Sequence, residues 1–214
     1  MVGGEGATHI EEVSTDLLAS VALGAIALYL GVCVLGRSLL QRRRTGSTGW
    51  RGIGHPFGTA GWWAGVLVAL GGAGMVIVPA VTMLAEPRPV ASAQVVGGAV
   101  LFVLGFGLTV WAQLAMGDAW RIGVEEGERT ELRTTGPFAV SRNPIFSGMS
   151  LATLGIALWV PWALPVWVAF TAGMVWQVRA VEEPHLLRVH GIAYRRYAAR
   201  TGRFVPGLGR RLGA

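Results

Sequence analysis

Four long apolar runs dominate this chain of 214 residues and restrict what it can fold into. They lie at about residues 17–36, 61–84, 94–116 and 144–181. A helix that crosses a bilayer needs roughly 20 mostly apolar residues, because the hydrocarbon layer is about 30 Å thick and a helix rises about 1.5 Å per residue. Each run meets this requirement, so the sequence predicts an all-α, polytopic membrane helical bundle.

The fourth run is long enough for two helices. Pro161 and Pro165 interrupt it near its middle, and proline cannot continue a helix without losing a backbone hydrogen bond. We therefore expect a C-terminal helical hairpin, which brings the total to about five spans. Each arm has only roughly 16 residues, so a deep re-entrant hairpin is the alternative to two full crossings.

The distribution of arginine predicts the orientation in the membrane. All 18 basic residues are arginines, and 17 of them follow the first run, precede the fourth run or lie in the tail, which leaves only Arg88 on the other side. Basic residues concentrate on the cytoplasmic side, so we expect the N-terminus outside and the C-terminus in the cytoplasm, in an inner or plasma membrane. Although the net charge is +6, its placement indicates membrane lipids as partners and no nucleic acid.

The glycines and the one long polar side chain of the third run indicate how the helices pack. Small residues such as Gly98 and Gly105 allow helices to approach closely in lipid. Because no strand is expected before them, they do not indicate a nucleotide-binding loop. Gln113 is expected to face the interior of the bundle.

A polar segment with a strong helix-start signal precedes the fourth run. Asn143 suits the cap position and Pro144 the first helical position, which leaves backbone N–H groups unpaired at the membrane surface. With Arg142 beside them, these groups could bind an anion. The simpler interpretation is that the helix only begins here and that Arg142 contacts lipid phosphate.

Two adjacent carboxylates, Glu182 and Glu183, follow the second arm of the hairpin. Carboxylates beside hydrocarbon need partners, and Arg179 lies one helical turn earlier, so a purely structural salt bridge is one interpretation. Metal binding is the other, but His185 and His190 are five residues apart and do not align well on one helix face. We therefore predict no metal site.

The residue pattern of the tail after the hairpin predicts an amphipathic helix on the cytoplasmic surface. Leu186, Leu187, Tyr194 and Tyr197 can share an apolar side, while the arginines between them face solvent or lipid head groups.

At these residues the chain resembles the isoprenylcysteine carboxyl methyltransferase family, the integral-membrane methyltransferases related to phospholipid methyltransferases. The resemblance covers about residues 117–206, and the order and spacing of five motifs hold across it. The motifs stand here as Gly136-Pro137-Phe138, Arg142-Asn143-Pro144-Ile145-Phe146, Glu182-Glu183, His190-Gly191-Ile-Ala-Tyr194-Arg-Arg-Tyr197 and Arg203-Phe204-Val205-Pro206.

The resemblance implies that the protein binds S-adenosylmethionine and methylates a lipophilic or lipid-linked substrate that enters from the bilayer, with carboxyl O-methylation expected first. Residues 1–116 then form an N-terminal three-span membrane region, and residues 117–214 the cofactor-binding and catalytic region. The expected catalytic residues are Arg179, Glu182 and Arg121. The expected cofactor-binding residues are Gly136, Pro137, Phe138, Arg142, Asn143, Pro144, Phe146, Glu183, His185, Tyr194 and Tyr197.

Three departures from the family pattern leave the methyl acceptor open, and the sequence also admits two other functions. Asn143 stands where the family has histidine, and Phe138 and Phe146 stand where it has tyrosine. One alternative is an NADPH-dependent membrane reductase of the sterol-reductase type, which has a similar hairpin and basic tail. The other is a non-enzymatic membrane scaffold or small-molecule channel in which the glutamate pair is structural.

Overall fold

The computed structural model describes residues 13–50, 55–121 and 131–210, which fold into helices without a strand. Two π-helical segments, Gly31–Gly36 and Val178–Glu182, interrupt the longer helices, and 3-10 turns lie at Gly117–Ala119 and Pro161–Ala163. The α-helices are α1 (Thr15–Leu30), α2 (Arg37–Thr45), α3 (Ala60–Thr82), α4 (Ser92–Met116), α5 (Pro137–Val140), α6 (Pro144–Trp159), α7 (Leu164–Gln177), α8 (Glu183–His190) and α9 (Ile192–Arg200).

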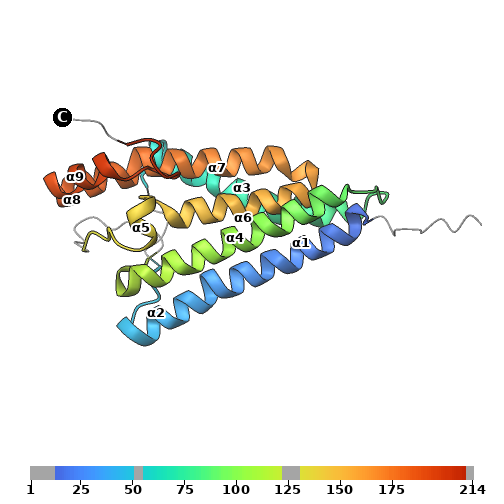
Figure 1. Ribbon diagram of the computed structural model, residues 1–214, viewed down its shortest axis with the longest axis horizontal. Coiled ribbons are helices and arrows are strands. Elements are labelled where there is room, and N and C mark those ends of the chain that lie inside the picture. Colours follow the sequence, from blue (N-terminus) through green and yellow to red (C-terminus); the bar gives the residue numbers. More distant parts are fainter. Residues whose placement is uncertain (1–12, 51–54, 122–130, 211–214) are drawn as a thin grey trace, which may run out of the picture.

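The predicted all-α polytopic fold is confirmed. Four continuous helical stretches are long and apolar enough to cross a membrane: Thr15–Thr45, Ala60–Thr82, Ser92–Ala119 and Pro161–His190. The apolar helix α6 is shorter, with 16 residues. Figure 1 shows the long helices side by side in one elongated bundle. The total of five spans remains a prediction.

The predicted hairpin is formed by α6 and α7. The chain leaves α6 at Val160, whose φ of −125° and ψ of 86° are not helical, and turns through Pro161–Ala163 into α7. Trp159 near the tip donates from its indole Nε1 to the carbonyl oxygen of Val95 at 2.9 Å. Because Val95 lies in the first turn of α4, the tip is level with the start of that helix, at the end of the bundle where α1 begins (Figure 1).

Glycines hold α4 and α6 in close contact, as the sequence predicted. A Cβ atom added at Gly155 of α6 would lie 2.5 Å from the carbonyl oxygen of Gly98 of α4. Seven residues earlier on α6, a Cβ at Gly148 would lie 2.7 Å from the carbonyl oxygen of Gly105. The two backbones therefore touch at two points, and any side chain there would push the helices apart.

Helix α3 packs against α7 by the same means. A Cβ at Gly71 would lie 2.7 Å from the Cα atom of Phe170, and one at Gly173 would lie 3.0 Å from the backbone nitrogen of Val68. The outward faces of the spans carry large exposed side chains, among them Leu35, Leu70 and Val103. Such faces suit contact with lipid, where backbone groups are satisfied within each helix.

The short helices gather at one end of the bundle. Helices α2, α5, α8 and α9 lie together at the left of Figure 1, opposite the connection between α3 and α4. This is the end that the arginine distribution predicts to be cytoplasmic, although Arg51, Arg129 and Arg211 lie outside the described residues. The side of the membrane on which it lies remains a prediction.

Where the sequence predicted a single amphipathic helix in the tail, the structure has two helices, α8 and α9, because Gly191 adopts a φ of 51° and ends α8. The four predicted apolar residues do pack together across this break. The cluster contains Leu186, Leu187, Tyr194 and Tyr197, with Ala198 and Leu132.

Candidate functional site

A three-residue ion cluster joins α6, α8 and the C-terminal segment. Arg142, just before α6, donates from Nη2 to Glu183 Oε1 at 2.6 Å. Arg203 donates to the same carboxylate from Nε at 2.8 Å and from Nη2 at 2.9 Å. The side chains of Arg142 and Glu183 are each 1% exposed. Glu183 is therefore held by arginines 41 and 20 residues away, not by the neighbouring Arg179 that the sequence suggested.

The remaining hydrogen bonds of Arg142 go to the backbone of the tail. Its Nη1 donates to the carbonyl oxygens of Ala198 and Thr201, and its Nη2 donates to that of Gly209. Within the described chain, Nε of Arg142 is buried without a hydrogen-bond partner. Since both terminal nitrogens serve the protein itself, Arg142 fixes the tail against α6 and keeps only its Nε–H for other use.

The start of α6 is tied to the closing segment of the tail. The backbone nitrogen of Asn143 donates to the carbonyl oxygen of Arg203 at 3.1 Å, and Asn143 Nδ2 donates to the same oxygen at 2.9 Å. Asn143 occupies the predicted cap position, but its side chain does not cap the helix. Pro144 stands in the first turn, as predicted. Ser147 Oγ adds a bond to the carbonyl oxygen of Phe204 at 2.7 Å.

The Gly136-Pro137-Phe138 motif forms the short helix α5 and is fixed by a tyrosine of α9. Gly136 precedes the helix with a φ of 60°, a conformation that favours glycine, and Pro137 begins it. The hydroxyl of Tyr197 donates to the carbonyl oxygen of Phe138 at 2.6 Å. Tyr194 packs edge-on against Tyr197 and is fully buried. These contacts place the Phe138 side chain where it lines a cavity.

This cavity lies between the start of α6, the π-helical segments and the end of α4, and has a volume of about 360 Å³. Small-molecule sites commonly measure about 300–1,000 Å³ and combine apolar walls with a few polar groups. The cavity fits that description. Its lining consists of Tyr29, Cys33, Val34, Val68, Gln113, Met116, Trp120, Arg121, Phe138, Arg142, Asn143, Pro144, Ile145, Phe146, Met149, Glu182, His185 and Leu186.

Opposite charges face each other across this lining. Arg121, which follows the turn at the end of α4, interacts electrostatically with Glu182. Buried His185 stands one turn further along the same helical stretch as Glu182. Gln113 donates from Nε2 to the carbonyl oxygen of Cys33 at 3.0 Å, so it faces the bundle interior as predicted. The cavity thus offers a cation, a carboxylate, an imidazole and aromatic faces.

The structure divides the predicted site residues into three groups. Eight of them line the cavity: Arg121, Phe138, Arg142, Asn143, Pro144, Phe146, Glu182 and His185. Five belong to the ion cluster or to the packing beside the cavity: Gly136, Pro137, Glu183, Tyr194 and Tyr197. Arg179 lies elsewhere, in a groove on the outer face of α7 with Trp167 and Trp176.

Sequence reasoning missed the contribution of the N-terminal region to this cavity. Tyr29, Cys33 and Val68 come from spans that the sequence predicted only as a membrane region. Both π-helical segments supply lining residues, Cys33 from the first and Glu182 from the second. Such segments are frequent at functional sites, but they leave no pattern in the sequence. In the described chain, no group of three or more His, Cys, Asp or Glu residues is placed to hold a metal.

Comparison with known proteins agrees with this architecture. Residues 93–193 match the family model of phospholipid methyltransferases. The fold is similar to that of the eukaryotic intramembrane Ras methyltransferase, isoprenylcysteine carboxyl methyltransferase, with a TM-score of 0.60 and 19% sequence identity over 91% of this chain and 68% of that chain. No curated protein matches in sequence. The family match and the shared fold confirm the resemblance that the motifs suggested.

Proposed function

We propose that this integral-membrane methyltransferase transfers the methyl group of S-adenosylmethionine to a carboxylate of a lipophilic substrate held in the 360 Å³ cavity. The observation that carries the proposal is the convergence of Arg121, Glu182 and the start of α6 on one cavity, within the region that matches the methyltransferase family. The side chains that line this cavity suit both the cofactor and the acceptor.

The chemistry of the lining fits the cofactor. A sulfonium and ribose hydroxyls suit the carboxylate of Glu182 and the aromatic faces of Phe138 and Phe146. A carboxylate suits the start of α6, where Asn143 and Ile145 line the cavity beside the unused Nε–H of Arg142. We therefore assign cofactor contacts to these residues, and we regard Glu183, Tyr194 and Tyr197 as the framework that holds them in place.

When bound, the cofactor supplies an electrophilic methyl group on a positively charged sulfur. The protein then has to hold the acceptor oxygen in line with that methyl group and keep water away from it. A carboxylate is ionised already at neutral pH and requires no general base. We assign Arg121 to binding the acceptor carboxylate, because it is a cation on the cavity wall and arginine forms paired hydrogen bonds with carboxylates.

A second cavity supports the choice of a lipophilic acceptor. It has a volume of about 120 Å³ and lies between α1, α3, α4, α6 and α7. Tyr29 and Met149 line both cavities, and the other lining residues of the second are almost all apolar, including Met75, Phe102 and Ile156. A hydrocarbon chain extending from the reacting carboxylate would find an apolar environment there.

Ligand-dependent stability tests the cofactor. A ligand that binds only the folded protein raises its melting temperature by mass action. We expect S-adenosylhomocysteine to raise the melting temperature of the detergent-solubilised protein, and NADPH to leave it unchanged. Stabilisation by NADPH alone would favour the reductase alternative, and no effect of either ligand would favour a scaffold or channel.

A further inference from the structure

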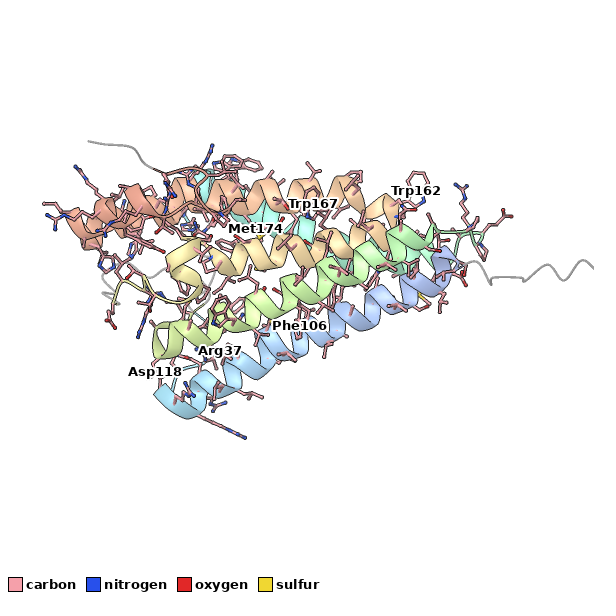
Figure 2. The ribbon with its side chains drawn as sticks, viewed as in Figure 1. Arg37, Phe106, Asp118, Trp162, Trp167 and Met174 are labelled. Atoms are coloured by element: carbon pink, nitrogen blue, oxygen red, sulfur yellow. The ribbon has the colours of Figure 1, made fainter. Side chains whose placement is uncertain are left out.

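Three residues on one face of α2 contact the turn that leads out of α4. Arg37, Gln41 and Arg44 are spaced by four and three residues, so they lie on the same side of the helix. The guanidinium of Arg37 donates to the carbonyl oxygen of Gly117, and Gln41 Nε2 donates to that of Asp118 at 2.7 Å. Arg44 lies 4.0 Å from the Asp118 carboxylate. Figure 2 shows Arg37 and Asp118 at the same end of the bundle.

Arg37 also contacts Trp120, the residue that follows the turn. Its guanidinium carbon stands 4.8 Å from the centre of the Trp120 ring, a cation–π distance. Nη1 of Arg37 donates to Gln41 Oε1 at 2.9 Å, which orients the amide so that its nitrogen points to the turn. One arginine and one glutamine thus fix two carbonyl oxygens and an indole ring.

Arg37 is 4% exposed and Gln41 is also 4% exposed, so these contacts are buried. Burying a guanidinium whose terminal hydrogen bonds go to uncharged oxygens is costly compared with burying an apolar side chain. The buried guanidinium fixes the geometry of this region, because its planar group binds the Gln41 amide, the Gly117 carbonyl oxygen and the Trp120 ring at the same time.

The turn held in this way leads directly into the proposed site. Trp120 and Arg121 both line the 360 Å³ cavity, and Trp120 is 2% exposed. Gly117, between the end of α4 and these two residues, has a φ of 56°, a conformation that favours glycine. The positions of Trp120 and Arg121 therefore depend on contacts made by α2, which contributes no residue to the lining.

We propose that Arg37 and Gln41 are positioning residues, which hold the Gly117–Ala119 turn so that Arg121 can bind the acceptor carboxylate. This inference rests on the proposed function. Arg37 and Gln41 act through the turn and do not touch the reactants. The cofactor contacts assigned above come from α5, α6 and the second π-helical segment, so loss of the α2 contacts should affect the acceptor and not the cofactor.

The test compares Arg37→Met and Gln41→Leu with the control Arg43→Met, an exposed arginine of the same helix. We expect the KM for the acceptor to rise about tenfold in Arg37→Met and less in Gln41→Leu, since misplacement of a substrate-binding group weakens its interaction. The dissociation constant of S-adenosylhomocysteine should change less than about twofold in either variant, and Arg43→Met should match the wild type.

Hydrogen exchange at residues 117–121 supplies a readout independent of activity. The amide of Trp120 donates to the carbonyl oxygen of Gly117, and it should exchange faster in Arg37→Met and Gln41→Leu than in the wild type. An unchanged acceptor KM in both variants would overturn the proposal, as would equal losses of acceptor and cofactor affinity. If the wild type transfers no methyl group, the proposed function fails, while the exchange data still decide whether α2 holds the turn.

Discussion

Arg142 donates to Glu183 at 2.6 Å, and this buried contact joins the start of α6 to the start of α8. Arg203 closes the arrangement from the C-terminal side by donating twice to the same carboxylate. The separate motifs found in the sequence therefore meet in one structural cluster. Their spacing reflects the length of the α6–α7 hairpin that connects them, because both arms must return the chain to the same end of the bundle.

Removing the charge at the centre of this cluster should destabilise the protein. In Glu183→Gln, the buried guanidinium of Arg142 and the partly buried guanidinium of Arg203 lose their counter-charge, and breaking a buried pair by altering one partner costs about 3–5 kcal/mol. We expect a clearly lower melting temperature in detergent. Glu131→Gln is the matched control, because Glu131 forms an exposed pair with Arg133 whose contribution should be about 0–1 kcal/mol. Equal melting temperatures for the two variants would contradict a stabilising role of this ion cluster.

Replacing the cation on the cavity wall should strongly lower activity without unfolding the protein. Arg121→Gln removes the charge assigned to the acceptor carboxylate, and we expect kcat/KM for methyl transfer to fall by about 100-fold. The melting temperature should stay close to that of the wild type. Arg133→Gln, at a partly exposed arginine that does not line the cavity, is the control. Full activity in Arg121→Gln would remove Arg121 from the site.

The contact between α4 and α6 should tolerate no side chain at Gly155. A methyl group there would lie 2.5 Å from the carbonyl oxygen of Gly98 and 2.7 Å from the nitrogen of Phe102. Overpacking of this kind costs about 1–3 kcal/mol, so Gly155→Ala should unfold at lower denaturant. Gly107→Ala in α4 is the control, since nothing lies within 4 Å of a Cβ there. Similar unfolding of the two variants would show that the helices are not in contact as described.

Tyr197→Phe separates a structural role from a cofactor-binding role. The variant loses the 2.6 Å hydrogen bond to the carbonyl oxygen of Phe138, and leaving that acceptor unpaired should cost about 1–3 kcal/mol. We expect a lower melting temperature with an unchanged dissociation constant for S-adenosylhomocysteine. A weaker affinity at an unchanged melting temperature would instead place the hydroxyl in contact with the cofactor.

The membrane fold could be predicted from the sequence because it depends on the apolar composition of long segments. The apolar runs set the lengths of the spans, and prolines set the turn of the hairpin at Pro161. The glycines of α4 also indicated close packing correctly. The break at Gly191 was less predictable, because a glycine within an amphipathic pattern can either continue a helix or end it.

The site could be predicted only in part, because the sequence motifs indicate which residues belong to it but do not indicate which residues contact one another. The cofactor contacts expected of Arg142 and Glu183 stay predictions, while no pattern in the sequence indicated that the two side chains pair with each other. The contact between Arg37 and the turn at Gly117 joins residues 80 apart, and in the sequence Arg37 was indistinguishable from the other arginines of its connection. Contacts of this kind form only when the helices pack into the bundle, and no local sequence pattern indicates them.

The most direct test of the proposed function is the fate of a labelled methyl group. Membranes containing the protein would be incubated with methyl-labelled S-adenosylmethionine and a lipid extract, and the lipid products would then be treated with alkali. We expect labelled methanol to be released, because alkali hydrolyses methyl esters and leaves methylated amines and phenols intact, and we expect about 100-fold less release with Arg121→Gln. Label that enters lipids but resists alkali would contradict carboxyl methylation, and the absence of any labelled lipid would contradict the proposed function.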